Sequence, residues 1–381
     1  MPEPTRDEPI VPPQVPPHPE AASSADERTA GLGASGLRDN DLSFLDQPQA
    51  QDELGRLGSF RILKELGRGG MGCVLLAEDT GLQRPVALKV MLPRFAQDEK
   101  AKTRFLREAR AAGKLHHDNV VSIFQVGESN GVPFIAMEFL KGMPLDEYLK
   151  EKPDLALPIV LKIGREIGLG LAAAHQLGMI HRDIKPANVW LESLPAAPGK
   201  KSGGFRVKIL DFGLARREED GEAHLTQSGA IVGTPAYMAP EQAKGEKIDA
   251  RADLFSLGVL LYRLATGTPA FTGPTTLALL MQVSSHDPGL ASEVKPTVPV
   301  EMARIIAKLM AKKREDRYGS AAEFLADWER LMKSPKQEAA TQTFVKPSEP
   351  RPTSEPRPSG SGPASLAQSG PQKTLDTIAA R

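Results

Sequence analysis

Three glycines near residue 70 are spaced so that the main chain around them could lie against phosphate groups. Gly67, Gly69 and Gly72 form the pattern G-x-G-x-x-G within ELGRGGMGCVLL, residues 65 to 76. Glycines at this spacing allow a close approach because no side chain stands between the backbone and a phosphate. The pattern alone permits three interpretations: a dinucleotide site, a loop over the phosphates of ATP, or a flexible turn.

The residues that follow the glycines separate these alternatives. A dinucleotide site requires a strand, a loop and a helix, with an acidic residue about 20 positions further on. Here the β-prone segment CVLLAED follows, then the turn TGLQ and a second predicted strand, RPVALKVML, which places Lys89 near that position. The Walker A string G-x-x-x-x-G-K-[ST] is absent from the sequence. The pattern favours a β-hairpin whose glycine tip covers nucleotide phosphates, with a lysine on the third strand.

The elements that must position these residues form a β-rich part followed by a helical part. Predicted strands are FRILKEL, CVLLAED, RPVALKVML, VVSIFQVGE and VPFIAMEFL. A helix over 98–115 interrupts them and places Phe105, Ala109 and Ala112 on one face. Further helices are predicted at 145–150, 157–178, 252–266, 274–284, 300–313 and 320–332. A small β lobe before a larger α lobe predicts an α+β fold with a cleft between the lobes.

Composition limits the function and the cellular location. The 381 residues contain 48 basic and 48 acidic side chains, so net charge gives no reason to expect a nucleic-acid partner. One cysteine, Cys73, excludes an internal disulfide and fits a reducing compartment. The acidic, Pro-rich N-terminus does not resemble a signal peptide, and no stretch reaches the roughly 18 apolar residues of a membrane span. We therefore expect a cytoplasmic chain with no membrane span.

Both ends of the chain have a composition that is typical of disorder. Residues 1–56 are rich in Pro, Ala and acidic residues, and residues 334–381 are rich in Pro, Ser and Thr, with SEPRP occurring twice. Such segments cannot bury enough apolar surface to offset the entropy lost on ordering. The sequence therefore predicts a single folded region over 57–333.

Five short motifs occur in one order along this region: GRGGMGCV, VALK, HRDIKPAN, DFG and APE. With them, residues 60–332 resemble the protein kinase family. GTPAYMAPEQA and FSLGVLLYRLATGTPAFTGPT resemble the bacterial, eukaryotic-like serine/threonine kinases. The resemblance implies a two-lobed kinase fold, with an N-lobe over 57–139 and a C-lobe over 140–333. It also implies transfer of the γ-phosphate of ATP to Ser/Thr hydroxyls of proteins, with Mg²⁺ as cofactor and Mn²⁺ as a substitute.

The resemblance assigns the lysine of VALK to the nucleotide. Lys89 would contact the α- and β-phosphates and would be held by an ion pair with Glu108 on the helix 98–115. The alternative for Glu108 is a surface glutamate paired locally with Arg107 or Arg110.

The same resemblance assigns the catalytic loop and the metal ligands. Asp183 would accept the proton of the substrate hydroxyl, and Lys185 would neutralise the transferring phosphate. Asn188 and Asp211 would bind the metal, and Phe212 would pack against the helix that carries Glu108. Loss of Lys89, Asp183, Asn188 or Asp211 would have favoured a pseudokinase that acts as a scaffold, and all four are present.

Other motif residues would support the loop or hold the nucleotide. Glu241 is expected to pair with Arg317, and Asp253 to hold the catalytic-loop backbone. Met137 aligns with the gatekeeper, although it could equally be a core residue. Adenine would bind the Glu138 carbonyl and the Leu140 amide. The implied ATP site consists of Leu66, Gly67, Arg68, Gly69, Gly70, Met71, Gly72, Cys73, Val74, Ala87, Lys89, Met137, Glu138 and Leu140.

Two features concern regulation and departures from the family. Thr226 and Ser228 precede APE at a plausible distance, and we expect autophosphorylation there, with Arg182 able to bind the phosphate, in a transient homodimer. The alternative is that both are unmodified turn residues. Residues 193–204 are an insertion that is typical of a flexible surface loop between two short strands.

Overall fold

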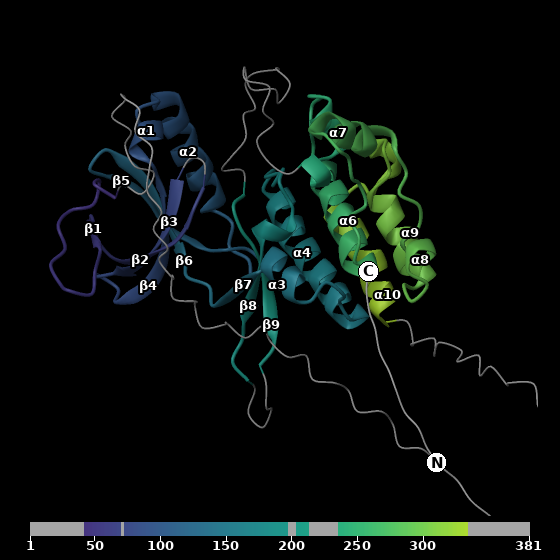
Figure 1. The fold of residues 1–381 in the computed structure, drawn as a ribbon, viewed down its shortest axis with the longest axis horizontal. Coiled ribbons are helices and arrows are strands. Elements are labelled where there is room, and N and C mark those ends of the chain that lie inside the picture. The colour runs from purple at the N-terminus through teal and green to yellow at the C-terminus, as the bar shows by residue number, and fades with distance from the viewer. Residues whose placement is uncertain (1–41, 70–71, 197–202, 213–234, 334–381) are drawn as a thin grey trace, which may run out of the picture. The chain divides into compact units, whose positions relative to one another are not determined.

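The computed structural model describes residues 42–69, 72–196, 203–212 and 235–333, which Figure 1 draws in colour. Several expectations fall outside these residues: those for Gly70 and Met71 in the glycine loop, for the phosphosites Thr226 and Ser228, and for the tail from residue 334. Among the helices of the described residues, none is both long and apolar enough to cross a membrane.

A six-stranded antiparallel sheet forms the first part of the fold, in the order β1-β2-β3-β4-β6-β5. Its strands are β1 (Gly55–Leu57), β2 (Phe60–Arg68), β3 (Gly72–Asp79), β4 (Arg84–Met91), β5 (Ile123–Ser129) and β6 (Val132–Glu138). One face of β3 and β4 is buried in a hydrophobic cluster that includes Leu75, Val86 and Leu88. The strands predicted on both sides of the glycines are confirmed.

The helix α2 (Glu99–Ala112) packs on β5 and β6, close to the short helix α1 (Pro93–Ala96) (Figure 1). It begins after Asp98, whose carboxylate accepts hydrogen bonds from the amides of residues 100 and 101 and so caps the first turn. Its buried residues are Phe105, Ala109 and Ala112, as predicted from their spacing. The helix is shorter than the predicted span 98–115.

The second part of the fold is mainly helical and also contains a small three-stranded sheet in the order β7-β8-β9. Its elements are β7 (Gly142–Pro144), α3 (Leu145–Glu151), α4 (Leu157–Gln176), η1 (Pro186–Asn188), β8 (Val189–Ser193), β9 (Phe205–Ile209), η2 (Pro235–Tyr237), α5 (Pro240–Ala243), α6 (Arg251–Thr266), α7 (Thr276–Ser285), α8 (Ala291–Val294), α9 (Val300–Leu309), η3 (Arg314–Asp316) and α10 (Ala321–Lys333). The insertion joins β8 to β9, the two short strands expected on either side of it.

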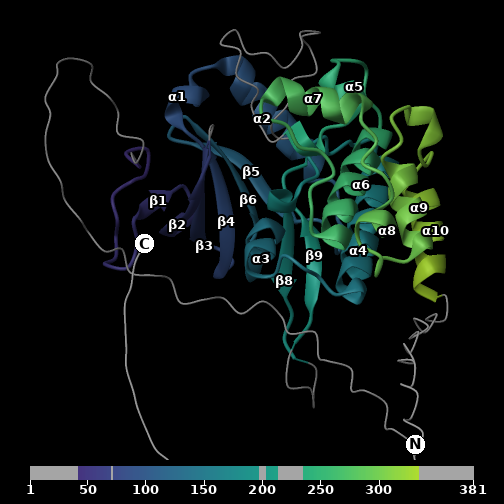
Figure 2. The ribbon, with the colours of Figure 1, turned by 45° about the vertical axis from the view of Figure 1, so that its right-hand side comes forward.

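The helix α6 is the centre of this part, and Figure 2 shows it near α4 and α9, both of which it contacts. From Ala252 to Thr266 every residue of α6 except Arg263 is buried. A helix that is apolar all round belongs in the core of a large domain. It therefore gives the surrounding loops a rigid support.

The prediction for α9 is wrong at its C-terminal end, because the helix stops at Leu309 rather than at residue 313. The carbonyl groups of Ala311 and Lys312 accept hydrogen bonds from Arg317, at 2.8 and 3.2 Å. These carbonyls are turned toward the guanidinium, so the chain leaves the helical path here.

The prediction of disorder over residues 1–56 is wrong for residues 42–56, which are folded in the structure. Phe44 is buried in the same cluster as the sheet, and the amide side chain of Asn130 donates to its carbonyl at 3.2 Å. Glu53 has a fully buried carboxylate that accepts from Arg56 Nε (3.2 Å) and Arg61 Nε (2.9 Å), and also from the amide of residue 49. A few anchoring residues suffice here because the segment adds to an existing sheet.

Replacing Glu53 with Gln is expected to lower the melting temperature at pH 7. The hydrogen bond from the amide of residue 49, together with those from Arg56 and Arg61, holds the pKa of Glu53 below its usual range. A depressed carboxyl pKa contributes stability above the unfolded-state pKa, about 4.3, and that contribution is lost as the pH falls through the folded-state value. The melting temperatures of the wild type and of Glu53→Gln, measured by thermal unfolding, should therefore become equal in acid.

The exposed Glu147→Gln serves as a matched control and should leave the melting temperature unchanged at both pH values. A Glu53→Gln protein that melts with the wild type at pH 7 would show that this segment does not stabilise the sheet.

Candidate active site

The catalytic loop is held by one buried carboxylate, that of Asp253 in the first turn of α6. Its two oxygens accept from the amides of His181 (2.8 Å) and Arg182 (2.7 Å), and it also bonds the ring of His175 at 2.8 Å. Arg182 has a φ of 68°, a conformation that is unfavourable for a residue other than glycine. The expected role of Asp253 is confirmed, since its carboxylate offsets the cost of this turn.

Two of the predicted catalytic-loop residues, Lys185 and Asn188, contact the carboxylate of the third, Asp183. Its Oδ2 accepts from Asn188 Nδ2 at 3.0 Å and lies 2.8 Å from Lys185 Nζ. The Asn188 amide also donates to the Asp183 carbonyl at 2.7 Å. These bonds fix the carboxylate and leave a lysine cation directly beside it.

The two predicted metal ligands, Asn188 and Asp211, lie on neighbouring segments of chain. The amide of Leu210 donates to the carbonyl of Asn188 at 2.9 Å, which ties the end of β9 to η1. Asn188 uses its Nδ2 in both bonds to Asp183, so its Oδ1 is directed elsewhere. Asp211 has a φ of 56°, and such strain in a residue other than glycine is frequent at functional sites.

This donor set fits Mg²⁺. One carboxylate and one amide oxygen are hard ligands, and Mg²⁺ usually takes one or two protein carboxylates and completes its shell with water and substrate phosphates. No group of three or more His, Cys, Asp or Glu side chains that could hold a metal occurs in the described part of the chain. The carboxylate of Asp211 and the amide oxygen of Asn188 fit a hard divalent metal whose other ligands are water and phosphate oxygens.

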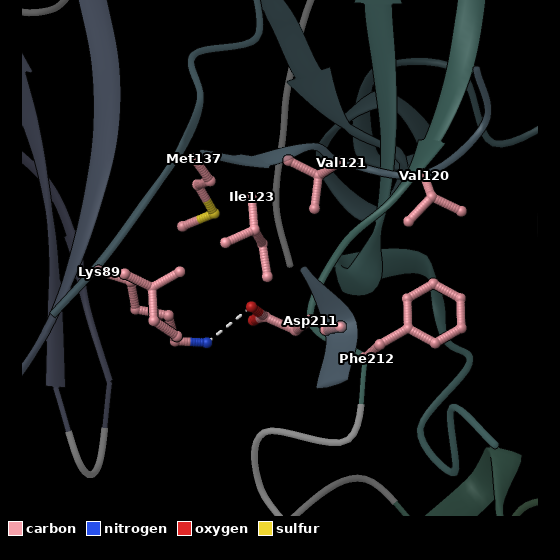
Figure 3. A pocket seen from close by; sticks show the side chains of 9 residues that line it. Lys89, Val120, Val121, Ile123, Met137, Asp211 and Phe212 are labelled. Carbon is pink, nitrogen blue, oxygen red and sulfur yellow. Dashed lines mark hydrogen bonds and ion pairs between the residues drawn. The ribbon is translucent and has the colours of Figure 1, made fainter. Parts of the chain in front are cut away.

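The predicted ion pair between Lys89 and Glu108 is not formed, which is the main correction at this site. Lys89 Nζ lies 2.7 Å from Asp211 Oδ1 instead, as Figure 3 shows. Glu108 is half-buried, and burial raises the pKa of its carboxyl, although Arg104 and Arg182 lie near enough to oppose this shift. Because α2 does not bring Glu108 to Lys89, the lysine pairs with the metal ligand.

The register of the sheet decides which of the predicted ATP-site residues face the cleft. Val74 lies opposite Lys89 in the β3–β4 pair, and Cys73 opposite Val90. Side chains alternate between the two faces, so Val74 and Lys89 share one face. Cys73 is 1% exposed within the hydrophobic cluster of the other face. The side chain of Cys73 therefore points away from the cleft, so only its main chain can take part in the implied ATP site; burial raises the pKa of its thiol.

The glycines at the ends of β2 and β3 have separate structural roles. The amide of Gly69 donates to the carbonyl of Gly72 at 2.8 Å across the hairpin. A Cβ atom at residue 72 would lie 2.4 Å from the carbonyl oxygen of Val90, so only glycine fits there. At Gly67 a Cβ would meet nothing within 4 Å. The space beside Gly67 is thus open among the described residues, while Gly72 is required by the sheet itself.

Comparison with known proteins decides the family of this fold. A protein kinase domain matches residues 60–328, well over half of the chain. The chain belongs to the protein kinase family. It is 40% identical over 281 residues to the serine/threonine-protein kinase Pkn1 of Myxococcus xanthus, which covers 72% of this chain and 39% of that protein. It is 36% identical over 270 residues to the serine/threonine-protein kinase PknB of Mycobacterium tuberculosis, covering 70% and 42%.

Solved kinase domains show the same two-lobed fold. The PknI kinase domain of Mycobacterium tuberculosis aligns with a TM-score of 0.56 at 27% identity, covering 74% of this chain and 99% of that one. The chain spans about 40% of the length of the curated relatives it matches. These relatives identify a bacterial-type serine/threonine kinase domain, and this family uses ATP and a divalent metal.

Behind the Lys89–Asp211 pair, the kinase cleft closes on an apolar wall (Figure 3). Met137 lines it together with Ile123, Ile135 and Phe212, and the space left is only about 10 Å³, which is close to the room for one water. The Phe212 ring packs edge-on against His181, 4.7 Å between centroids, and Ala112 of α2 lines the same space. Phe212 and this helix thus line one space, and their direct packing stays a prediction. Met137 fills the back of the cleft as a packed residue.

The segment joining the lobes contains an interaction that sequence reasoning missed. The ammonium of Lys208, which is 4% exposed, lies 2.8 Å from Glu138 Oε2 and 3.4 Å from the Val120 carbonyl. It thereby connects β9 of the C-lobe to the last residue of β6. A lysine between Val207 and Ile209 in a short apolar strand was the signal that could have revealed it.

Replacing Lys208 with Met is expected to raise the KM for ATP about tenfold with a smaller change in the KM for the acceptor. The substitution leaves the Glu138 carboxylate without its cation, and a lost bond to a charged group costs about 1.5–3 kcal/mol. Glu138 then no longer holds the main chain that adenine is expected to contact. Steady-state kinetics with ATP and acceptor varied separately measures both constants.

Lys100→Met, at an exposed position on α2, is the matched control and should leave both constants unchanged. An unchanged KM for ATP in Lys208→Met would show that the ion pair does not position the hinge.

Proposed function

We propose that this chain is an ATP-dependent protein kinase that transfers the γ-phosphate of ATP to Ser and Thr hydroxyls of other proteins. The observation that carries the proposal is the bonded set around Asp183. Lys185 and Asn188 both contact its Oδ2, and the Asn188 carbonyl is tied to the segment that leads into Asp211. A base, a cation and one metal ligand thus share one loop, and that loop is hydrogen-bonded to the segment that carries the second metal ligand. Phosphoryl transfer requires this set, because its catalysis is mainly positioning and charge stabilisation.

Each residue has a distinct role in the proposed reaction. Asp183 accepts the proton of the acceptor hydroxyl at Oδ2, and Lys185 stabilises negative charge on the phosphoryl group as it moves. Asn188 and Asp211 would hold the metal, which neutralises phosphate charge when bound. Lys89 contributes a second cation from the opposite lobe. Mg²⁺ is the proposed ion, with Mn²⁺ as a substitute, since both accept hard oxygen ligands.

The Lys89–Asp211 pair suggests how the cleft changes when the nucleotide binds. Both partners have other duties in the proposed reaction, Lys89 at the phosphates and Asp211 at the metal. We propose that ATP and metal separate them and that Lys89 then pairs with Glu108, which forms no ion pair with any described residue and whose carboxyl pKa is raised by burial. The structure would then represent the kinase before its substrates enter.

The remaining proposals concern the ATP contacts and regulation. The cleft-facing residues Val74, Ala87 and Lys89 are proposed to contact ATP, with adenine on the main chain of Glu138 and Leu140. We further propose protein substrates, autophosphorylation at Thr226 and Ser228 within a transient homodimer, and a cytoplasmic location. No nucleic-acid partner is proposed, because acidic and basic residues balance at 48 each.

Labelled ATP tests the proposed function directly. Purified protein, γ-labelled ATP, Mg²⁺ and a generic protein acceptor are incubated with and without EDTA, and the acceptor is then hydrolysed for phosphoamino-acid analysis. We expect metal-dependent label on Ser and Thr. Label on Tyr would contradict the acceptor class, and nucleotide binding without any transfer would favour a scaffold.

A further inference from the structure

A hollow of about 430 Å³ lies beside the catalytic loop, separate from the apolar wall behind Lys89. Residues of α3, η1, η2 and α6, and of the segment that follows α6, line it. Leu149, Tyr237 and Phe271 give it apolar walls, and Lys185 connects it to Asp183. Its volume is in the range of about 300–1,000 Å³ that is typical of ligand sites.

Arg263 gives this hollow an unneutralised positive charge. It is the one residue between Ala252 and Thr266 of α6 that is not buried, and its side chain lines the hollow. Its guanidinium makes no hydrogen bond or ion pair with any residue that the structure describes. Lys150 adds a second cation, while the charge of Lys185 is already paired with Asp183; Asp146 is the one carboxylate among the described lining residues. The hollow therefore favours an anionic occupant.

Asp146 adds a second requirement for the occupant. Its Oδ1 is buried and has no hydrogen-bond donor among the described residues, although a buried carboxylate oxygen needs one. Arg263 and Asp146 both act on the hydroxyl of Tyr237, the first lowering and the second raising its pKa, while burial raises it most. Asp146, Tyr237 and Arg263 all line this hollow. An acidic residue of a peptide satisfies both, because its carboxylate reaches the arginine and its main-chain N–H can donate to Asp146.

We propose that Arg263 is a specificity-determining residue that selects acceptor segments with Asp or Glu close to the phosphorylated Ser or Thr. This inference rests on the proposed kinase function. Lys185 lines the hollow and also lies 2.8 Å from the Asp183 carboxylate, so the occupant is near the acceptor hydroxyl. An extended peptide advances about 3.3–3.6 Å per residue, so the three positions on either side of the acceptor span about 10 Å, and we propose that the acidic residue lies among them.

A positional peptide series tests this with the full chain. Each peptide carries one Thr, with Glu, Gln, Lys or Ala placed at each of the three positions on either side, and kcat/KM is measured for each. At one position, wild type should phosphorylate the Glu peptide about two- to fivefold better than the Ala peptide, the upper part of the range for a partly exposed charge pair. Arg263→Glu should reverse this order and favour Lys, since the new carboxylate repels Glu.

Two further variants separate the effect of the charge at residue 263 from the effects of a structural change and of a change in net charge. Arg263→Gln removes the charge with less perturbation of α6 and should flatten the profile without reversing it. Arg304→Glu makes the same charge change at a side chain that is 69% exposed on α9, and should keep the wild-type profile.

The possible outcomes distinguish a failure of the role proposed for Arg263 from a failure of the proposed kinase function. A wild type that labels a generic protein acceptor but shows no preference for Glu, or prefers Lys, would overturn the role of Arg263 alone. Retention of the Glu preference in Arg263→Gln and Arg263→Glu would do the same. Absence of transfer to every peptide and protein would overturn the kinase function and this inference together.

Discussion

The Asp183→Asn protein is expected to phosphorylate acceptors with a kcat about 10²–10⁴-fold below that of the wild type, the range for loss of a general base. An amide cannot take the hydroxyl proton, yet its oxygen can still accept the bonds that Asn188 Nδ2 and Lys185 Nζ make to Oδ2. The loop should therefore keep its shape, and the KM for ATP should change little. Steady-state phosphorylation of a protein acceptor gives both constants.

The control for this substitution is Asp118→Asn, whose side chain is 85% exposed and makes one long ion pair with Arg206. It should have the kcat of the wild type. The melting temperatures of all three proteins should agree, which separates lost chemistry from lost folding. A kcat within threefold of the wild type in Asp183→Asn would contradict the role given to this carboxylate.

The Arg317→Met protein is expected to lose about 3–5 kcal/mol in the free energy of unfolding, the cost of removing one partner from a buried ion pair. Arg317 makes two bonds to Glu241, at 2.7 and 2.8 Å, and both side chains are almost completely buried. It also donates to the carbonyls of Ala311 and Arg251. Methionine fills the volume but leaves the Glu241 carboxylate without a partner.

Tryptophan fluorescence during urea unfolding measures this loss in the lobe concerned, because Trp328 is fully buried there. Arg304→Met, which breaks an exposed pair 3.9 Å apart, should cost less than about 0.5 kcal/mol. The double variant Arg317→Met with Glu241→Leu should recover part of the loss, since it removes the unpaired charge. A loss below about 1 kcal/mol in Arg317→Met would show that the pair does not stabilise the C-lobe.

Sequence reasoning succeeded where a motif and its local pattern determine the structure. The buried face of α2 followed from the spacing of its apolar residues, and the bonds of Asp253 and Arg317 followed from the family motifs. That Asn188 and Lys185 share one loop with Asp183 followed from the motif, but their bonds to its carboxylate were not predicted. Short-range geometry of this kind depends little on the rest of the fold.

The failures have a different physical origin. The partner of Lys89 depends on where α2 and the segment of Asp211 sit relative to the sheet, and no local pattern encodes that position. The four apolar or small residues of CVLL show no alternation, so the face of Cys73 could not be read from them. Residues 42–56 look disordered by composition, yet Phe44 and Glu53 find partners that only the folded sheet supplies.

The transfer of labelled γ-phosphate to a protein acceptor tests directly whether this chain is a kinase in which Asp183 is the base. Wild type and Asp183→Asn are saturated with γ-labelled ATP and Mg²⁺, shown to bind ATP equally, and mixed with a protein acceptor in a single-turnover experiment. We expect wild type to place the label on Ser and Thr of the acceptor at a rate about 10²–10⁴-fold above that of the variant. Equal transfer rates in the two proteins, or no transfer by either, would contradict this expectation.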